Sequence, residues 1–194
     1  MTGLLEAKIS VQDYLELEKV SELRYEFVDG ELIEMPGTRK AHNEIIQNFM
    51  LALTRLARSK GCRMYGESIK LQTTPSKFRY PDVMLSCQPS QDDYLEFAPC
   101  FLAEILSDST EITDYGAKVR EYLALPSLQT YAIIAQTERL IVVYQRDEKG
   151  WRYQLLTEGQ LELPCLETSL ALEAIYEGIA FAEPADAAAT TDSK

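Results

Sequence analysis

Histidine is scarce in this sequence, and the cysteines are widely spaced. One histidine occurs among 194 residues, and the four cysteines include no Cys-x-x-Cys pair. Structural zinc sites draw on clustered Cys and His residues, so this pattern leaves such a site few possible ligands. Free cysteine is usually a buried core residue. We therefore expect reduced, mostly buried thiols at Cys62, Cys87, Cys100 and Cys165.

Long apolar runs and targeting signals are missing as well. No stretch approaches the ~20 apolar residues that span a bilayer. The N-terminus, MTGLLEAKISVQD, has no basic stretch followed by an apolar one, which excludes a secretory signal. We expect a cytoplasmic protein with no membrane partner.

Positive charge is in short supply. The chain has 19 Lys and Arg against 31 Asp and Glu, a formal net charge of −12. Binding to phosphates depends on cations that displace counterions, and a chain this acidic repels DNA at long range. The segment 55–63 (RLARSKGCR) nevertheless gathers four cations. The charge therefore argues against tight, general DNA binding and leaves room for a weak or local contact.

The length and the order of predicted elements fit one α/β domain over residues 1–181. Residues 182–194 end in EPADAAATTDSK, which has nothing to bury, and we expect a mobile tail there. No internal repeat or linker divides the chain.

Apolar periodicity and turn residues define the elements. Asp29-Gly30 stands between two extended runs in 24–35 and favours a type I′ hairpin. Helical spacing of apolar residues, ended by Gly61, predicts an amphipathic helix over 41–59. Further helices are predicted over 11–19, 114–125 and 169–179. Further strands are predicted over 66–73, 80–85, 101–106, 131–135, 140–144 and 151–156.

Two carboxylates and one ammonium stand out against these elements. Asp82 follows Pro81 at the start of a strand, and Glu104 lies inside the apolar strand FLAEIL, where an unpaired carboxylate is costly. Lys118 lies on the next helix. Two neighbouring strands can bring their carboxylates within several ångströms, as Mg²⁺ requires, and a nearby ammonium can orient or deprotonate a water or stabilise phosphate charge.

The same residues also allow a purely structural interpretation. Glu104 can be a buried acid with a raised pKa or an arginine partner. Asp114 and Lys118 are four residues apart on one helix and can form a surface salt bridge. Spacing alone does not separate these alternatives from a metal site.

Taken together, several motifs resemble the PD-(D/E)XK nuclease superfamily, and within it the Uma group of restriction endonuclease-like proteins. The resemblance covers about residues 10–145. It is carried by the Tyr25–Glu31 hairpin, the His42 helix, Pro81-Asp82, Glu104-Ile-Leu-Ser-Asp-Ser-Thr110, Asp114, Lys118, Tyr122 and Tyr131-Ala-Ile-Ile.

The resemblance implies a restriction-endonuclease-like core, a mixed central sheet flanked by helices, in which Asp82 and Glu104 bind Mg²⁺ or Mn²⁺. The simplest form of the motif places a lysine two residues after the glutamate, where this chain has Leu106. The Uma-like pattern moves the lysine to the next helix, which implies Lys118. Ala132, where the group usually carries tryptophan, is interpreted as a packing difference. A homodimer is implied too, because one site cuts one strand and duplex scission needs two.

Three further residues are auxiliary candidates. Glu67 is a possible third metal ligand, although a solvated strand end is the commoner role for such an acid. His42 can transfer protons, but we expect it to cap its helix and pack under the site. Glu26 is either structural in the hairpin or a partner of the site residues.

Three functions are compatible with this sequence. The first is a Mg²⁺- or Mn²⁺-dependent endonuclease acting on DNA phosphodiesters. The second is a weakly active or inactive dimeric binding module that keeps the nuclease fold, which the acidic charge and the missing E-x-K favour. The third is a hydrolase of a smaller phosphate ester.

Overall fold

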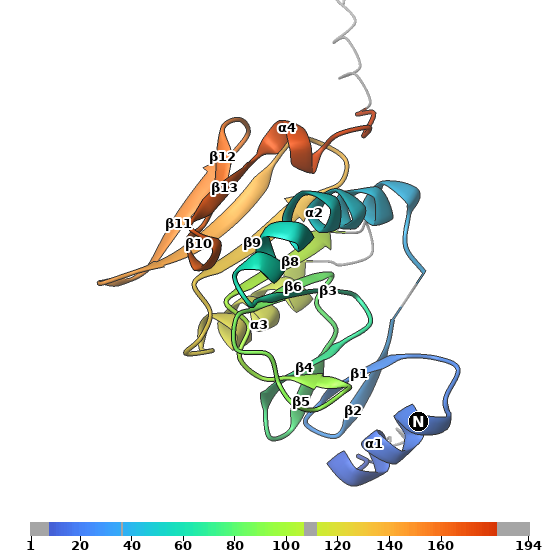
Figure 1. Ribbon diagram of the computed structural model, residues 1–194. Coiled ribbons are helices and arrows are strands. Elements are labelled where there is room, and N and C mark those ends of the chain that lie inside the picture. The colour runs from blue at the N-terminus through green and yellow to red at the C-terminus, as the bar shows by residue number, and fades with distance from the viewer. Residues whose placement is uncertain (1–7, 36, 107–111, 182–194) are drawn as a thin grey trace, which may run out of the picture.

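The computed structural model describes residues 8–35, 37–106 and 112–181. The expected tail at 182–194 lies outside these residues. Figure 1 shows a central sheet between two smaller units: a second sheet with helix α1 at one end, and a hairpin with helix α4 at the other. None of the helices in the described part of the chain is long and apolar enough to cross a bilayer.

The central sheet has six strands in the order β11-β10-β9-β8-β6-β3. Strands β8 and β9 pair in parallel and all other neighbours are antiparallel, so the sheet is mixed, as expected. Its strands are β3 (Arg63–Gly66), β6 (Val83–Ser86), β8 (Phe101–Leu106), β9 (Thr130–Ala135), β10 (Ile141–Asp147) and β11 (Gly150–Leu156).

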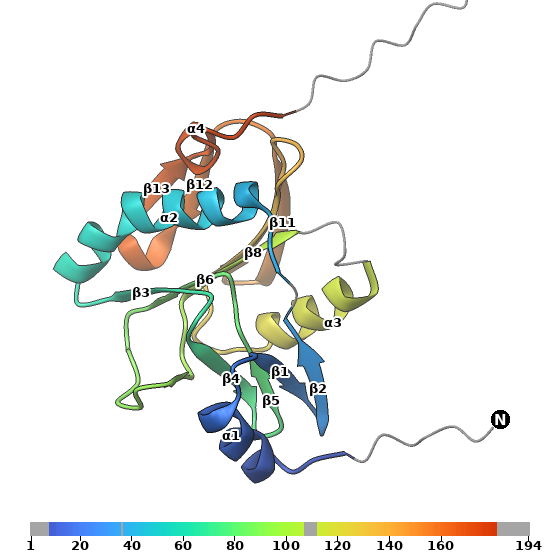
Figure 2. The same ribbon diagram turned by 90° about the vertical axis from the view of Figure 1, so that its right-hand side faces the viewer.

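Two helices cover opposite faces of this sheet (Figure 2). Side chains alternate along a strand, so each buried strand contributes to two cores. Val83 and Phe101 belong to the core that contains the buried residues of α2 (Lys40–Ser59). Met84 and Leu102 belong to the core that contains Tyr122 of α3 (Ile112–Leu123).

A second sheet, ordered β2-β1-β5-β4-β7, packs against α1 (Val11–Val20). A capping box at Ser10 begins this helix, which the sequence predicts over 11–19. Tyr14 is fully buried and stacks on Phe27, with ring centroids 4.8 Å apart. The strands are β1 (Tyr25–Val28), β2 (Glu31–Glu34), β4 (Lys70–Thr74), β5 (Lys77–Arg79) and β7 (Leu95–Glu96).

The hairpin prediction at Asp29-Gly30 is confirmed, with positive φ angles of 51° and 98° at the two turn residues. The predicted strand 66–73 is wrong as a single element. It is divided between β3 and β4, which belong to different sheets. The predicted strand 80–85 begins only at Val83. The helices over 11–19, 41–59 and 114–125 and the strands 101–106, 131–135, 140–144 and 151–156 form with small shifts of their ends.

The helix predicted over 169–179 is also largely wrong. The chain forms strand β12 (Gln160–Leu163), the 3₁₀ turn η1 (Pro164–Leu166) and strand β13 (Thr168–Ala171), and the two strands pair. Within the predicted helix only α4 (Leu172–Ile175) is α-helical. Pairing buries Leu161, Leu163 and Leu170 in the α2 core. Pairing with the preceding strand, β12, in a hairpin therefore overrides the helical pattern of this segment.

The cysteines differ from expectation as well. Cys62 and Cys87 form a disulfide, whereas Cys100 and Cys165 are free. In the β3–β6 pairing Arg63 lies opposite Ser86, and the same antiparallel register places Cys62 opposite Cys87. Residues separated by 25 positions in the sequence thus become direct cross-strand neighbours.

Candidate metal centre

The pairing of β6 with β8 brings Asp82 to Glu104. Val83 lies opposite Ala103, so the residues one step further along each strand, Asp82 and Glu104, are opposite each other at the end of the pairing. The backbone N–H of Ile105 donates to Asp82 Oδ2 at 2.6 Å. The structure therefore places the two acids on adjacent strands, as the sequence predicts.

Glu104 points to the side of the sheet that α3 covers. Lys118 Nζ lies 3.2 Å from its Oε2 and 3.3 Å from its Oε1, and the Tyr122 hydroxyl donates to Oε1 at 2.8 Å. Lys118 and Tyr122 are four residues apart, so both reach the strand from one face of the helix. The side chain of Asp114 lies outside those that the structure describes, and the described partners of Lys118 are Glu104 and Glu26.

Glu26, on β1 of the second sheet, connects this site to a buried ionic network. Its Oε1 lies 2.9 Å from Lys118 Nζ, and its Oε2 accepts a hydrogen bond from Arg79 at 2.8 Å. Arg79 also binds Glu121 with two hydrogen bonds, of 3.2 and 2.9 Å. Glu26 and Glu104 therefore both contact Lys118 Nζ, so Glu26 is a partner of a candidate site residue as well as a member of the ionic network.

His42 and Glu67 lie close to Asp82. His42 Nε2 lies 3.2 Å from Asp82 Oδ2, and ligand atoms of His42, Glu67 and Asp82 all lie within 4.8 Å of one another. His42 does not cap its helix, because the cap position is Arg39 and no side chain caps it. Its buried Nδ1 has no hydrogen-bond partner. Glu67 is half-buried in the turn after β3 rather than a fully solvated strand end.

These side chains line one cavity of about 360 Å³. Its walls come from both sheets and from α2 and α3, so no single segment of the sequence forms it. Residues of the α1–β1 connection and of the chain after β2, such as Leu23, Arg24 and Met35, line the cavity along with the acids. The cavity offers space for a ligand beside the carboxylates.

The electrostatics of the cavity favour an added cation. Burial, with repulsion from Asp82 and Glu26, raises the pKa of Glu104 to about 7 although Lys118 acts to lower it. Burial lowers the pKa of His42, but Asp82, Glu67 and Glu104 outweigh this effect and raise it overall. The negative charges of Glu104 and Glu26 likewise outweigh burial and raise the pKa of Lys118. Carboxylates outnumber their cationic partners here, and a divalent cation would relieve that imbalance.

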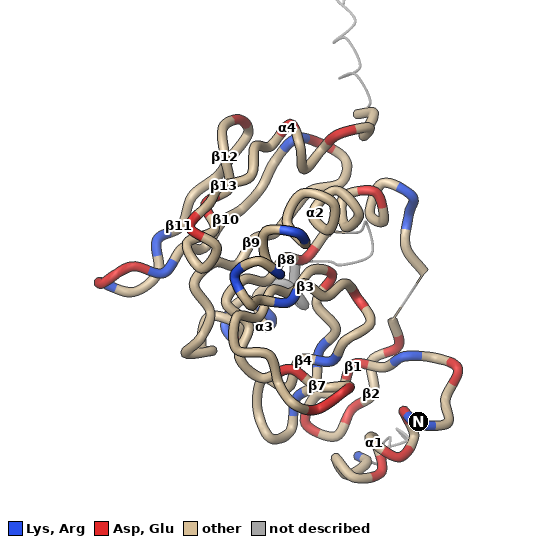
Figure 3. The backbone as a smooth tube through the Cα atoms, in the orientation of Figure 1, with Lys and Arg blue, Asp and Glu red and all other residues tan. Residues whose placement is uncertain are grey.

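Cations on β4 and β5 are paired with acidic side chains. Lys70 pairs with Glu18, and Lys77 pairs with Asp29 and Glu121. The basic segment 55–63 lies at the C-terminal end of α2, whereas His42 lies in its first turn. A rise of about 1.5 Å per residue separates these two ends by roughly 25 Å. In Figure 3 the chain leading into α2 is also basic.

Two parts of this centre could not be found from the sequence. Arg79 is an ordinary cation in the sequence, and its role as the partner of Glu26 and Glu121 depends on the contact between the two sheets. The unpartnered His42 Nδ1 is equally invisible without the structure. The alternation of apolar and polar residues around Arg79 could have indicated a strand, but not the partner.

Glu104→Gln is expected to stabilise the metal-free protein above neutral pH and not below pH ~5. Glu104 has a pKa of about 7 in the folded chain against 4.5 in the reference state. Between these values the folded state retains a proton that the unfolded chain has released, so wild-type stability falls as pH rises through this window. The difference corresponds to about 3 kcal/mol. Gln is neutral at every pH and avoids this loss.

Urea unfolding of wild type and Glu104→Gln at pH ~5 and pH ~8.5, with a chelator present, measures the effect. The variant should gain about 2–3 kcal/mol over wild type only at the higher pH. An equal difference at both pH values would contradict the raised pKa.

Comparisons with known proteins fit this fold. One solved structure, described as a putative nuclease belonging to DUF820 from Anabaena variabilis ATCC 29413, has a TM-score of 0.69 at 16% identity, covering 84% of this chain and 96% of that one. The similarity shows that the two proteins share a fold, a mixed α/β sheet flanked by helices.

The family follows from the sequence comparisons. The model of the Uma2 family, described as "Putative restriction endonuclease", matches residues 11–174. The chain belongs to the Uma2 family. Two uncharacterized proteins of Synechocystis sp. (strain ATCC 27184 / PCC 6803 / Kazusa) are 31% and 30% identical, over 90% and 77% of this chain and 94% and 86% of their own lengths.

Proposed function

We propose that this protein is a Mg²⁺- or Mn²⁺-dependent endonuclease that hydrolyses DNA phosphodiester bonds. The observation that carries the proposal is the juxtaposition of Asp82 and Glu104 at the end of the β6–β8 pairing, with Lys118 against Glu104. Membership of the Uma2 family supports a nuclease, and the cavity beside the acids supports a ligand site.

The residues fit a hard divalent cation. Asp82, Glu104 and Glu67 offer carboxylate oxygens, the ligand type that Mg²⁺ and Mn²⁺ prefer. Asp82 Oδ2 is already engaged by Ile105 N–H and His42, which leaves Oδ1 as the oxygen for a metal. A bound cation would supply positive charge to a phosphate oxygen and lower the pKa of a coordinated water.

Lys118 would then act as a cation and hydrogen-bond donor. In the metal-free protein the negative charges of Glu104 and Glu26 raise the pKa of Lys118, which favours the ammonium form over a neutral base. Glu26 fixes Nζ at 2.9 Å from one side, so the ammonium is held next to Glu104. In this position it orients the attacking water and stabilises the charge that develops on the phosphate.

His42 would act through Asp82 rather than on the substrate. Its raised pKa favours the charged imidazolium, which pairs with Asp82 Oδ2 and restricts the rotation of that carboxylate. We assign it a positioning role and not that of a general base.

The net charge of −12 favours one alternative substrate, a smaller phosphate ester that needs no extended basic surface. DNA contact would rest on Arg24, which lines the cavity, and on Arg39 and Lys40, which line a second pocket that shares Thr38 with it. We further propose a homodimer as the form that cuts both strands.

Supercoiled plasmid incubated with the purified chain tests the proposal. Wild type should nick the plasmid with Mg²⁺ or Mn²⁺ and not with a chelator, and Lys118→Met should reduce the rate by about 100-fold. Lys19→Met, a change at an exposed lysine on α1, should have no effect. Linear product would indicate paired sites. Equal nicking by wild type and Lys118→Met would point to a contaminant, and phosphate release from small esters without nicking would favour the alternative.

A further inference from the structure

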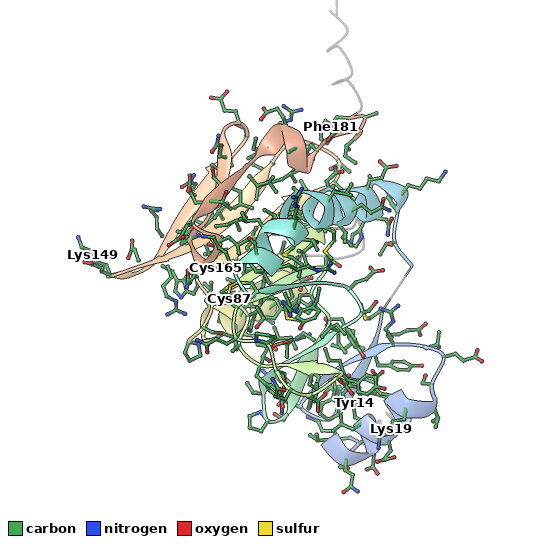
Figure 4. All side chains as sticks on the ribbon, in the orientation of Figure 1. Tyr14, Lys19, Cys87, Lys149, Cys165 and Phe181 are labelled. Carbon is green, nitrogen blue, oxygen red and sulfur yellow. A yellow bond between two sulfur atoms is a disulfide. The ribbon has the colours of Figure 1, made fainter. Side chains whose placement is uncertain are left out.

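All four cysteines of the chain converge on one place in the fold. Cys62 follows α2, Cys87 follows β6, Cys100 precedes β8 and Cys165 lies in η1. All four belong to the α2 core or pack against it. Figure 4 labels two of them, Cys87 and Cys165, which lie close together, and Cys87 Sγ is 3.8 Å from the carbonyl oxygen of Cys165.

The sulfur spacing fits a tetrahedral metal. Zn–S bonds of about 2.3 Å place the sulfurs of a tetrathiolate about 3.8 Å apart. Cys87 Sγ and Cys100 Sγ are 3.7 Å apart, and the sulfurs of Cys87, Cys100 and Cys165 all lie within 4.8 Å of one another. Three sulfurs are therefore already near the separations that zinc imposes, and Cys62 is bonded to one of them.

We propose that Cys62, Cys87, Cys100 and Cys165 form a tetrathiolate site for Zn²⁺ or a similar soft divalent cation in the reduced protein. In the structure two of the four sulfurs, those of Cys62 and Cys87, are bonded to each other as a disulfide. A phosphine or dithiol reductant supplies two electrons and converts this bond to two thiols. The four thiols then bind one zinc ion and release up to four protons, and the metal does not change its oxidation state.

The surroundings suit such a site. A zinc tetrathiolate carries two negative charges, and the basic segment 55–63 ends beside Cys62. Lys60 pairs with Glu167, which joins the segments that carry Cys62 and Cys165. Cys62 and Cys100 are buried, whereas Cys87 and Cys165 are half-buried and give the ion a route from solvent. The sequence spacing that argued against zinc is overcome by the fold.

This site is separate from the carboxylate centre. Asp82 precedes β6 and Cys87 follows it, so the two lie at opposite ends of one strand. At about 3.3 Å per residue they are roughly 16 Å apart. Asp82 lies opposite Glu104 in the β6–β8 register, and Glu104 faces α3. The cysteines belong to the core on the α2 side of the sheet. A metal at the cysteines would connect η1 to the central sheet rather than serve the hydrolysis.

Co²⁺ titration of the full chain tests the proposal, because thiolate ligands give cobalt intense near-ultraviolet charge-transfer bands that carboxylates do not. The chain is first reduced, stripped of metal and freed of reductant under anaerobic conditions. We expect these bands to saturate at one Co²⁺ per chain and to disappear when Zn²⁺ is added. The disulfide form should bind at least about 100-fold more weakly, and so should Cys165→Ser, since even the loss of residues that only support a ligand costs 10–100-fold.

Asp82→Asn is the matched control and should keep the cobalt bands, because it alters only the carboxylate centre. Circular dichroism establishes that Cys165→Ser folds. If that variant does not fold, the cobalt titration of the reduced wild type still tests whether the thiolates bind a metal. Absence of thiolate bands in the reduced wild type, or the same bands in a folded Cys165→Ser variant, would overturn the proposal.

Discussion

Asp82→Asn is expected to lower the rate of metal-dependent plasmid cleavage by at least about 10⁴-fold, which corresponds to about 5 kcal/mol in the activation barrier. Asn is nearly isosteric and can still accept the Ile105 N–H bond that Asp82 Oδ2 accepts at 2.6 Å. It has no negative charge with which to hold a divalent cation or to balance His42. The change therefore removes the charge of the centre while it preserves the shape.

Three measurements check this prediction. Single-turnover cleavage gives the rate, calorimetric titration with Mn²⁺ gives metal affinity, and circular dichroism gives the fold. Asp147→Asn, an exposed residue at the end of β10, is the matched control and should behave as wild type. Undiminished Mn²⁺ affinity in Asp82→Asn would contradict its role as a ligand, and undiminished cleavage would contradict the proposed function.

Arg79→Met is expected to reduce the free energy of unfolding by about 3–5 kcal/mol, because a buried ion pair that loses one partner leaves an uncompensated charge. The Arg79 side chain is 3% exposed and lies between Glu26 and Glu121, at 2.8 and 2.9 Å. These two carboxylates are themselves only 7% and 4% exposed. Lys118 still pairs with Glu26, and Lys77 lies 3.9 Å from Glu121, so part of the loss is offset.

Urea unfolding near pH 7.5 measures the loss, with Arg120→Met on the exposed side of α3 as the control. Arg79→Lys keeps the charge but cannot bind both carboxylates with the planar guanidinium, and an intermediate loss is expected. The combined variant Arg79→Met, Glu26→Gln, Glu121→Gln should regain part of the stability. A loss below about 1 kcal/mol in Arg79→Met would show that the network has little net value.

Much of the fold could be predicted from local sequence. Asp29-Gly30 forms the predicted hairpin because these two residue types tolerate the positive φ angles that the turn needs. The strand 101–106 forms where an apolar run surrounds one carboxylate, and the long helix ends before Gly61. Each of these features depends on neighbours within a few positions, so periodicity and turn chemistry are sufficient. The error at 169–179 arose where the start of the segment paired with the preceding strand, β12, instead of continuing as a helix.

The site divides in the same way. Asp82 and Glu104 could be found because a carboxylate in or beside an apolar strand is conspicuous, and the sequence determined which side chains carry the charge. Only the tertiary structure decided their partners: the β6–β8 register set Asp82 against Glu104, and contact between two sheets brought Glu26 to Lys118. The cysteines, widely spaced in the chain, meet for the same reason. Pairing across long sequence separations is fixed by the burial of whole faces, which no local pattern records.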